Sequence, residues 1–190
     1  MVNKGLLLVL SGPSGVGKGT IQKELRRRIK DIYYSVSATT RAPRKNETEG
    51  VDYFYISKSE FEDLIRTDSV LEYTEYCGNY YGTPKKEVDK MLSLGKIVLL
   101  EIETCGALQV IEKCKEAVSV FILPPSFEEL RNRLTARSTE PPEVVESRLE
   151  KAKWEIEQSV KYQYRVINDT VENAVSSIID IINENRKSEE

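Results

Sequence analysis

The sequence predicts an α/β fold in which a central parallel sheet lies between two layers of helices. Apolar runs occur at residues 6–10, 97–102, 118–123 and 164–168, and helix-forming segments separate them. The apolarity of these runs is mostly continuous rather than alternating, which is typical of strands buried on both faces of a parallel sheet. The alternation of strands and helices favours a doubly wound sheet with right-handed crossovers.

The first apolar run leads almost directly into a glycine-rich turn, GPSGVGKGT, and a helix is predicted at 21–30. The turn contains Gly12, Pro13, Ser14, Gly15, Val16, Gly17, Lys18, Gly19 and Thr20. Strand, glycine-rich turn and helix in this order are the context of a phosphate-binding loop, or P-loop, whose backbone N–H groups and helix start bind an anion. Lys18 is expected to bring a mobile charge to the outer phosphates. The sequence therefore predicts a P-loop NTPase rather than an ordinary glycine turn.

Each later helix of the fold begins at a residue that caps helices. The predicted helices cover residues 84–94, 127–136 and 171–185. We expect Thr83 to cap the first, with Pro84 at its first position. Ser126 and Glu129 have the spacing of a capping box for the second. Thr170 is expected to cap the third.

Two stretches interrupt the alternation and divide the chain. Residues 33–83 carry short, partly alternating strands and one helix at 58–67, which predicts a small β-rich insertion. Residues 126–158 are strongly charged and helical, with a break at Pro141–Pro142. We therefore expect a core formed by three segments, and these are residues 1–32, 84–125 and 159–190.

Composition excludes several function classes. The chain has 190 residues and a formal net charge of −3, which suits one α/β domain and argues against a general nucleic-acid binder. No run is long enough to cross a membrane. The three cysteines are scattered and read as reduced thiols, so we expect a cytoplasmic protein. There is no histidine, so the chemistry has to proceed without the commonest general base.

The segment from Ser37 to Arg44 is a candidate second anion site. Arg41 and Arg44 follow a group of hydroxyl residues, and guanidinium groups bind phosphate in a bidentate way. A solvated surface loop is an equal alternative. Further along, Tyr80 and Tyr81 stand between glycines; a phenol can donate to phosphate, but packing is the better interpretation for Tyr80.

Glu72 and Glu103 lie at or near the ends of apolar segments, where a carboxylate is unexpected unless it has a binding partner. Guanine presents N1–H and its 2-amino group side by side, and one carboxylate accepts both. Adenine would leave such a carboxylate unpaired, so a site of this kind discriminates strongly. An ion pair with a nearby lysine or arginine is an equal alternative for each.

A third basic group lies in the charged helical stretch. Its members are Arg131, Arg133, Arg137 and Arg148. Arg133 and Arg137 are four residues apart and share a helical face, from which they can reach a phosphoryl group in transfer. A charged helix that pairs with its own glutamates is an equal alternative.

Taken together these motifs resemble the guanylate kinase family, whose members phosphorylate GMP from ATP. The resemblance covers essentially the whole chain and rests on SGPSGVGKGT, SVSATTRAPR, EGVDYFYI, GNYYGT and LEIETCGA in the family's order. It implies a core, a GMP-binding insertion at 33–83 and a mobile lid at 126–158. ATP and GMP are the implied partners, with no nucleic acid and no membrane.

The resemblance also implies roles for single residues. Those implied to contact guanine are Ser37, Glu72, Thr83 and Glu103. Those implied to bind the GMP phosphate are Arg41, Arg44, Tyr53 and Tyr81. Those implied to stabilise the phosphoryl group are Lys18, Arg133, Arg137 and Arg148. Asn168 would lie near the adenine of ATP.

The chain departs from the family pattern at Gly19, where many relatives have serine. The hydroxyl that usually binds Mg²⁺ would follow Lys18 directly, but here it occurs one residue further along the chain, at Thr20. We therefore expect Mg²⁺ to be carried with ATP and held mostly by phosphates and water.

Two rival functions remain open at this point. One is a guanylate-kinase-like scaffold that binds protein partners without catalysis, which the intact P-loop with Lys18 disfavours. The other is a kinase for AMP or dTMP, which Glu72 and Glu103 disfavour.

Overall fold

The computed structural model describes residues 4–136 and 141–187. Its central sheet has five parallel strands in the order β2-β7-β1-β8-β9. The strands are β1 (Leu6–Ser11), β2 (Ile32–Tyr34), β7 (Ile97–Glu101), β8 (Val118–Leu123) and β9 (Tyr164–Ile167). The predicted parallel sheet is confirmed, and all four apolar runs are strands. The sequence pattern assigned residues 33 and 34 to the insertion, whereas β2 is a three-residue edge strand of the central sheet, too short to show a period of its own.

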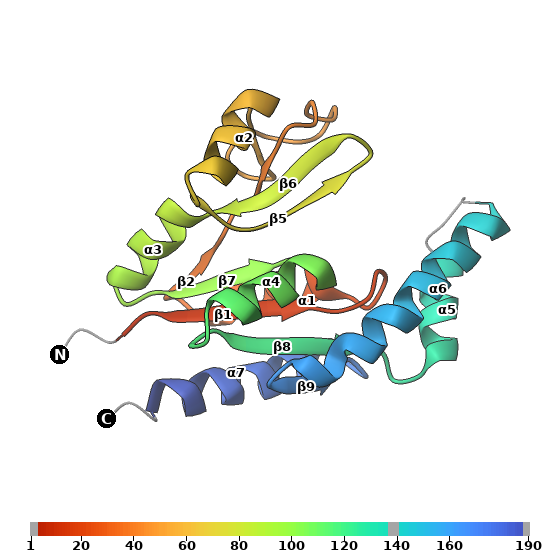
Figure 1. The fold of residues 1–190 in the computed structure, drawn as a ribbon. Coiled ribbons are helices and arrows are strands. Elements are labelled where there is room, and N and C mark those ends of the chain that lie inside the picture. The colour runs from red at the N-terminus through yellow and green to blue at the C-terminus, as the bar shows by residue number, and fades with distance from the viewer. Residues whose placement is uncertain (1–3, 137–140, 188–190) are drawn as a thin grey trace.

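Helices cover both faces of this sheet (Figure 1). Leu8 and Leu10 of β1 face one core, with α1 (Lys18–Arg28) and α7 (Val171–Lys187). Val9, with the opposite orientation, faces a second core with α3 (Lys85–Ser93) and α4 (Thr104–Lys113). Because successive side chains of a strand point to opposite faces, one continuous apolar run supplies both cores. The three-layer α/β/α arrangement is therefore confirmed.

The insertion forms a separate sheet in the order β4-β3-β6-β5. Its strands are β3 (Ala38–Thr39), β4 (Phe54–Tyr55), β5 (Val70–Tyr76) and β6 (Asn79–Pro84), and α2 (Lys58–Arg66) covers it. The fully buried Phe61 of α2 stacks on Tyr80 at 5.2 Å, which confirms packing as the role of Tyr80. The chain leaves the central sheet after Tyr34, not at residue 33 as expected, because β2 still pairs with β7.

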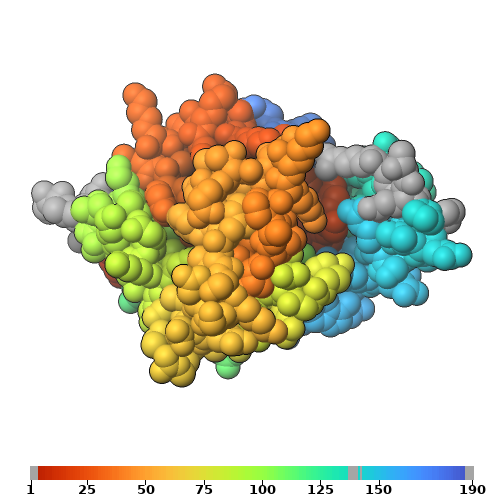
Figure 2. Space-filling model, turned by 90° about the horizontal axis from the view of Figure 1, so that it is seen from above, coloured from red at the N-terminus to blue at the C-terminus, as the bar shows by residue number. Residues whose placement is uncertain are grey.

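The charged stretch forms a helical pair beyond one end of the central sheet (Figure 1). It contains α5 (Phe127–Ala136) and α6 (Pro142–Glu157), followed by the 3₁₀ turn η1 (Gln158–Lys161). Arg131 of α5 and Glu146 of α6 form an ion pair at 3.1 Å. Seen from above, red atoms of the N-terminal segment lie between the orange insertion and the cyan and blue helical pair (Figure 2). No helix in the described ranges is long and apolar enough to span a bilayer.

The helix caps were predicted with mixed success. The Thr170 hydroxyl accepts the Asn173 N–H at 3.1 Å, which confirms the cap of α7. The Ser126 hydroxyl likewise accepts the Glu129 N–H at 3.0 Å, but the Glu129 carboxylate pairs with Arg133 and does not complete the box. The predicted Thr83 cap is wrong: Pro84 is the N-cap of α3, and the Thr83 hydroxyl donates to Glu72.

Gly82 of β6 has no room for a side chain. A Cβ there would lie 2.5 Å from the Glu72 carbonyl oxygen and 3.0 Å from the Phe61 ring. We expect Gly82→Ala to lower the free energy of unfolding by about 2 kcal/mol, because backbone and ring have to move. Gly19→Ala is the matched control, since its Cβ would meet only Glu101 at 3.9 Å and alanine favours a helix. Urea unfolding measures both, and equal effects would contradict this packing.

Candidate functional site

The P-loop connects β1 to α1 and has backbone angles that glycine favours. Gly15 and Gly17 have φ values of 84° and 104°. At Gly17 a Cβ would also lie 2.6 Å from the Asn168 amide nitrogen, so both space and conformation require glycine. Helix α1 begins at Lys18, three residues earlier than the sequence predicted, which brings the helix start to the loop itself. The loop therefore has the geometry expected of an anion cradle.

Lys18 folds back onto the loop that carries it. Its ammonium donates to the carbonyl oxygens of Gly12 at 2.5 Å and Pro13 at 3.3 Å. Burial lowers the pKa of Lys18, and the nearby carboxylates of Glu155 and Glu101 partly oppose that shift. Phosphate oxygens would compensate the same buried charge more completely than two carbonyl groups do.

Side chains from segments distant in the sequence form hydrogen bonds with the P-loop. Asn168, which follows β9 and is buried, donates from its amide to the Val16 carbonyl at 2.7 Å. Arg133 donates to the same carbonyl at 3.4 Å and to the Asn168 carbonyl at 3.2 Å. Arg148 of α6 donates to the Ser14 hydroxyl at 2.8 Å. The structure thus brings Arg133, Arg148 and Asn168 to the loop.

Two predicted roles near the P-loop stay predictions. Arg137 lies outside the described residues. The amide of Asn168 supports Val16, and its proximity to adenine is untested. The sequence did not predict the hydrogen bond from Asn168 to Val16, because these two residues are separated by more than a hundred positions.

Glu101 and Glu155 are carboxylates beside Lys18 to which the sequence analysis assigned no individual role; Glu101 is half-buried and Glu155 is buried. Glu101 ends β7, and burial raises its pKa. Glu155 belongs to α6, and burial raises its pKa as well. The position of Glu101 at a strand end was a usable signal, whereas Glu155 lies in a helix full of charges.

The donor set near Gly19 fits a hard cation that is bound mainly through a nucleotide. The described part of the chain contains no group of three or more acidic, cysteine or histidine side chains that could hold a metal ion by itself. Two oxygen donors adjoin Gly19: the hydroxyl of Thr20, the next residue in the chain, and the Glu101 carboxylate, which would lie 3.9 Å from a Cβ at Gly19. Mg²⁺ usually keeps several waters and phosphate oxygens as ligands, so two donors at the loop are compatible with it.

The second anion site gathers around Arg41. Its guanidinium lies 5.4 Å from the Tyr53 ring, and the Tyr53 and Tyr81 rings are 6.0 Å apart. Arg44 is largely exposed on the same loop. Glu47 forms two hydrogen bonds with Arg41, each 2.9 Å, and was missed by the sequence analysis. The structure therefore brings these predicted phosphate ligands together, with a carboxylate among them.

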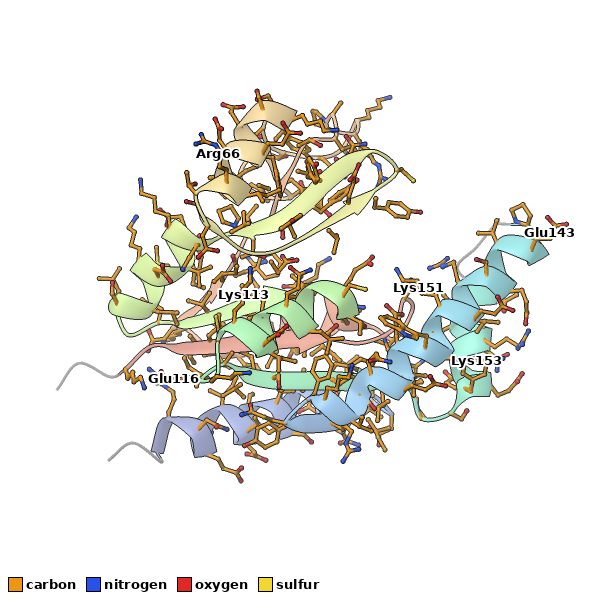
Figure 3. The ribbon with its side chains drawn as sticks, in the orientation of Figure 1. Arg66, Lys113, Glu116, Glu143, Lys151 and Lys153 are labelled. Atoms are coloured by element: carbon orange, nitrogen blue, oxygen red, sulfur yellow. The ribbon has the colours of Figure 1, made fainter. Side chains whose placement is uncertain are left out.

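Glu72 and Glu103 have different environments. Glu72 is 4% exposed, accepts the Thr83 hydroxyl at 2.7 Å, and has no ion pair in the described ranges. Burial raises the pKa of Glu72. Glu103 is exposed and pairs at 2.9 Å with Lys151, which lies on the side of α6 toward α4 (Figure 3). The ion-pair alternative thus describes Glu103, whereas Glu72 is a buried acceptor.

Ser37, which was predicted to contact guanine, lies just before β3 and is half-buried.

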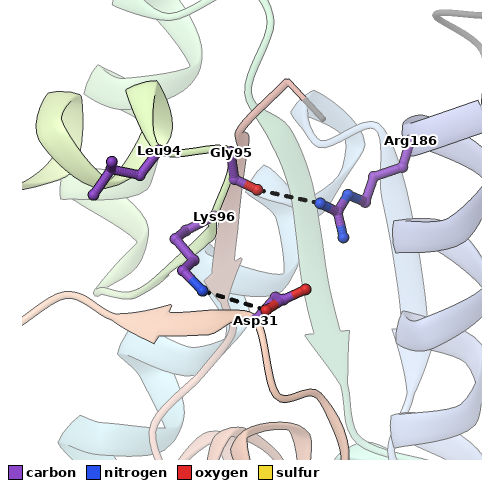
Figure 4. Close-up of a pocket in the computed structure, with 5 residues that line it drawn as sticks. All are labelled: Asp31, Leu94, Gly95, Lys96 and Arg186. Carbon is purple, nitrogen blue, oxygen red and sulfur yellow. Dashed lines mark hydrogen bonds and ion pairs between the residues drawn. The ribbon is translucent and has the colours of Figure 1, made fainter. Parts of the chain in front are cut away.

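A pocket of about 190 Å³ lies at the other end of the central sheet (Figure 4). It is lined by Asp31, Leu94, Gly95, Lys96 and Arg186. Lys96 pairs with Asp31 at 3.3 Å, and Arg186 donates to the Gly95 carbonyl at 3.2 Å. Ligands of open α/β sheets bind at the carboxyl ends of the strands, whereas this pocket is at the amino ends. It is therefore not the candidate site.

We expect Asn168→Ala to loosen the P-loop. The Val16 carbonyl would lose its short hydrogen bond, which costs about 1–3 kcal/mol of stability and weakens ATP binding by about tenfold. Asn173→Ala is the matched control, because its amide donates only to exposed Asp169 at 3.0 Å. Calorimetric titration with ATP measures the effect. An unchanged ATP affinity for Asn168→Ala would refute the supporting role.

Glu72→Gln should change how stability depends on pH. Because the folded protein holds the Glu72 proton at pH values where the unfolded chain has lost it, the stability of the original protein falls from the ordinary glutamate pKa up to the raised one. The glutamine variant lacks this loss. Its stability advantage in urea unfolding should therefore grow with pH across that window and then level off; a constant difference would contradict a buried, desolvated carboxylate.

Known proteins agree with this geometry over nearly the whole chain. A sequence model described as guanylate kinase matches residues 4–185. The guanylate kinase of Latilactobacillus sakei is 51% identical over 183 residues, covering 96% of this chain and 90% of the relative. That of Halalkalibacterium halodurans is 53% identical over 179 residues, covering 94% and 88%.

A solved structure agrees as well. The crystal structure of guanylate kinase from Anaplasma phagocytophilum superposes with a TM-score of 0.77 at 35% identity, covering 97% of this chain and 87% of that one. Sequence and fold lead to the same conclusion, and the chain belongs to the guanylate kinase family.

Proposed function

We propose that this chain transfers the γ-phosphoryl group of ATP to GMP at a site between the P-loop and the insertion. The observation that carries the proposal is Glu72, a buried carboxylate whose one oxygen accepts the Thr83 hydroxyl. Its other oxygen can accept a donor from guanine. The relatives described above are named guanylate kinases, which supports the same reaction.

The GMP phosphate is the nucleophile and is already anionic at neutral pH. The reaction therefore needs no general base, which is consistent with a chain that contains no histidine. What the protein supplies is alignment, charge neutralisation and exclusion of water. Lys18, Arg133 and Arg148 supply positive charge at the P-loop, and Arg137 is proposed to join them.

The two nucleotides are proposed to occupy opposite sides of the transferred group. ATP binds along the P-loop, residues 12–20, with Asn168 behind it. The residues proposed for GMP are Ser37, Arg41, Arg44, Tyr53, Glu72, Tyr81, Thr83 and Glu103. Mg²⁺ would arrive with ATP and neutralise phosphate charge, with Thr20 and Glu101 proposed as oxygen donors from the chain.

The three regions expected from the sequence are proposed to have separate tasks. The core binds ATP, the insertion at 33–83 binds GMP, and the helical pair within 126–158 acts as a lid. The contact between Arg148 and Ser14 supports the last assignment, because it joins α6 to the P-loop. The three cysteines form no disulfide, which is compatible with the proposed cytoplasmic location.

Substrate choice tests the proposal. A coupled assay of ADP production should show activity with GMP, and far less with AMP, dTMP or no acceptor. Glu72→Gln should lower kcat/KM for GMP by about a hundredfold or more, because its amide would meet the guanine donors with donors of its own, while ATP binding changes little. Better use of AMP than GMP would overturn the carboxylate argument. No GMP-dependent ADP production at saturating substrate would favour the scaffold alternative.

A further inference from the structure

Glu47 collects donors from three different residues of the insertion. Its two carboxylate oxygens accept from the two Nη atoms of Arg41, each at 2.9 Å. One oxygen also accepts the Arg44 backbone N–H at 2.8 Å and the Tyr55 hydroxyl at 2.8 Å. A carboxylate with this many donors is firmly oriented, and its bonds to Arg41 are of the charge-assisted, bidentate kind.

The donors of Arg41 can be counted. A guanidinium has five N–H groups. Glu47 takes one from each Nη atom, and the Ala42 carbonyl takes a second from Nη1 at 2.8 Å. The donors that remain are Nε–H and one hydrogen of Nη2, which form the edge of the group turned away from Glu47. Nε is buried and has no hydrogen-bond partner among the described residues.

The surroundings fix the plane of this guanidinium. Arg41 lies 5.4 Å from the Tyr53 ring and 6.0 Å from the Tyr55 ring, so aromatic faces restrict its rotation. The side chains of Arg41 and Glu47 are each only 16% exposed. Hydrogen bonds from Arg41 lower the pKa of Glu47 to about 2, so this carboxylate is ionised throughout the neutral range.

We propose that Glu47 is a positioning residue for the phosphate of the nucleoside monophosphate: it holds the end of the Arg41 guanidinium so that the opposite edge binds that phosphate. The inference rests on the proposed GMP site and adds to it a residue that itself contacts no substrate. Arg44 is left to act as a second, mobile cation, since its side chain is 75% exposed and lies 3.9 Å from Glu47.

Charge and positioning predict opposite effects for Glu47→Gln. Neutralising Glu47 makes the surroundings of two arginines more positive, so attraction alone would tighten GMP binding. If Glu47 competed with the phosphate for Arg41, its removal would also tighten binding. Positioning predicts weaker binding, because an unclamped arginine loses the orientation that a bidentate contact needs. The sign of the change therefore separates these explanations.

The experiment measures dissociation constants by calorimetry for GMP and for guanosine, which lacks the phosphate. For Glu47→Gln and Glu47→Ala we expect GMP binding to weaken by about tenfold or more, with guanosine binding unchanged. The KM for GMP should rise by a similar factor while kcat and the KM for ATP stay within about threefold. Glu49→Gln is the matched control: it makes the same charge change in the same loop, where Glu49 accepts the Tyr55 backbone N–H and does not pair with Arg41.

Three results would overturn the inference. They are tighter or unchanged GMP binding in both Glu47 variants, equal weakening for GMP and guanosine, and an equal effect of Glu49→Gln. The Arg44→Ala variant distinguishes failure of the positioning role of Glu47 from failure of the proposed GMP phosphate site. If Arg44→Ala weakens GMP binding and the Glu47 variants do not, the phosphate site is supported and the positioning role of Glu47 is refuted. If Arg44→Ala has no effect on GMP binding, the assignment of the phosphate site itself is refuted.

Discussion

The proposed site depends on how the protein's own oxygens hold the positively charged side chains that we propose bind phosphate. Lys18 donates to P-loop carbonyls, and Arg41 to a carboxylate. Arg133 donates to the Val16 carbonyl and Arg148 to the Ser14 hydroxyl. Because each cation already has a defined acceptor, it is held near the site before any substrate binds. Arg41 can keep its carboxylate partner when phosphate arrives, whereas Lys18 is expected to exchange its carbonyl partners for phosphate oxygens. Preorganised charge of this kind is the largest single contribution to many phosphoryl-transfer reactions.

The parallel sheet brings these groups together. Ser11 ends β1, Glu101 ends β7 and Asn168 follows β9, so three strands deliver polar groups to one edge. The insertion contributes what a strand end cannot, since Glu72 is buried within a second sheet and turns its carboxylate toward Thr83 rather than solvent. The proposed reaction uses both parts: the edge of the core sheet is proposed to bind ATP, and the separate small sheet is proposed to select guanine.

Most of the core was predictable from the sequence, because its signals are local. Continuous apolar runs, the glycine-rich turn and the Thr170 cap each depend on residues close in the chain. The errors concern partners that local spacing does not connect, whether they are distant in the sequence or lie across a turn or loop. Thr83 is a residue type that often caps helices, yet its hydroxyl donates to Glu72 on the neighbouring strand. Asn168 supports Val16 across the fold, and Glu47 lies in a loop whose spacing predicts no contact with Arg41.

We propose that the P-loop lysine and the buried Glu72 serve two different nucleotides in one reaction. The most direct measurement is a crystal structure with GMP and a non-hydrolysable ATP analogue. In that structure we expect the Lys18 ammonium to have left the Gly12 carbonyl for phosphate oxygens, and a Glu72 oxygen to accept a hydrogen bond from the guanine base. A structure in which Lys18 stays on Gly12, or in which the base lies away from Glu72, would contradict it.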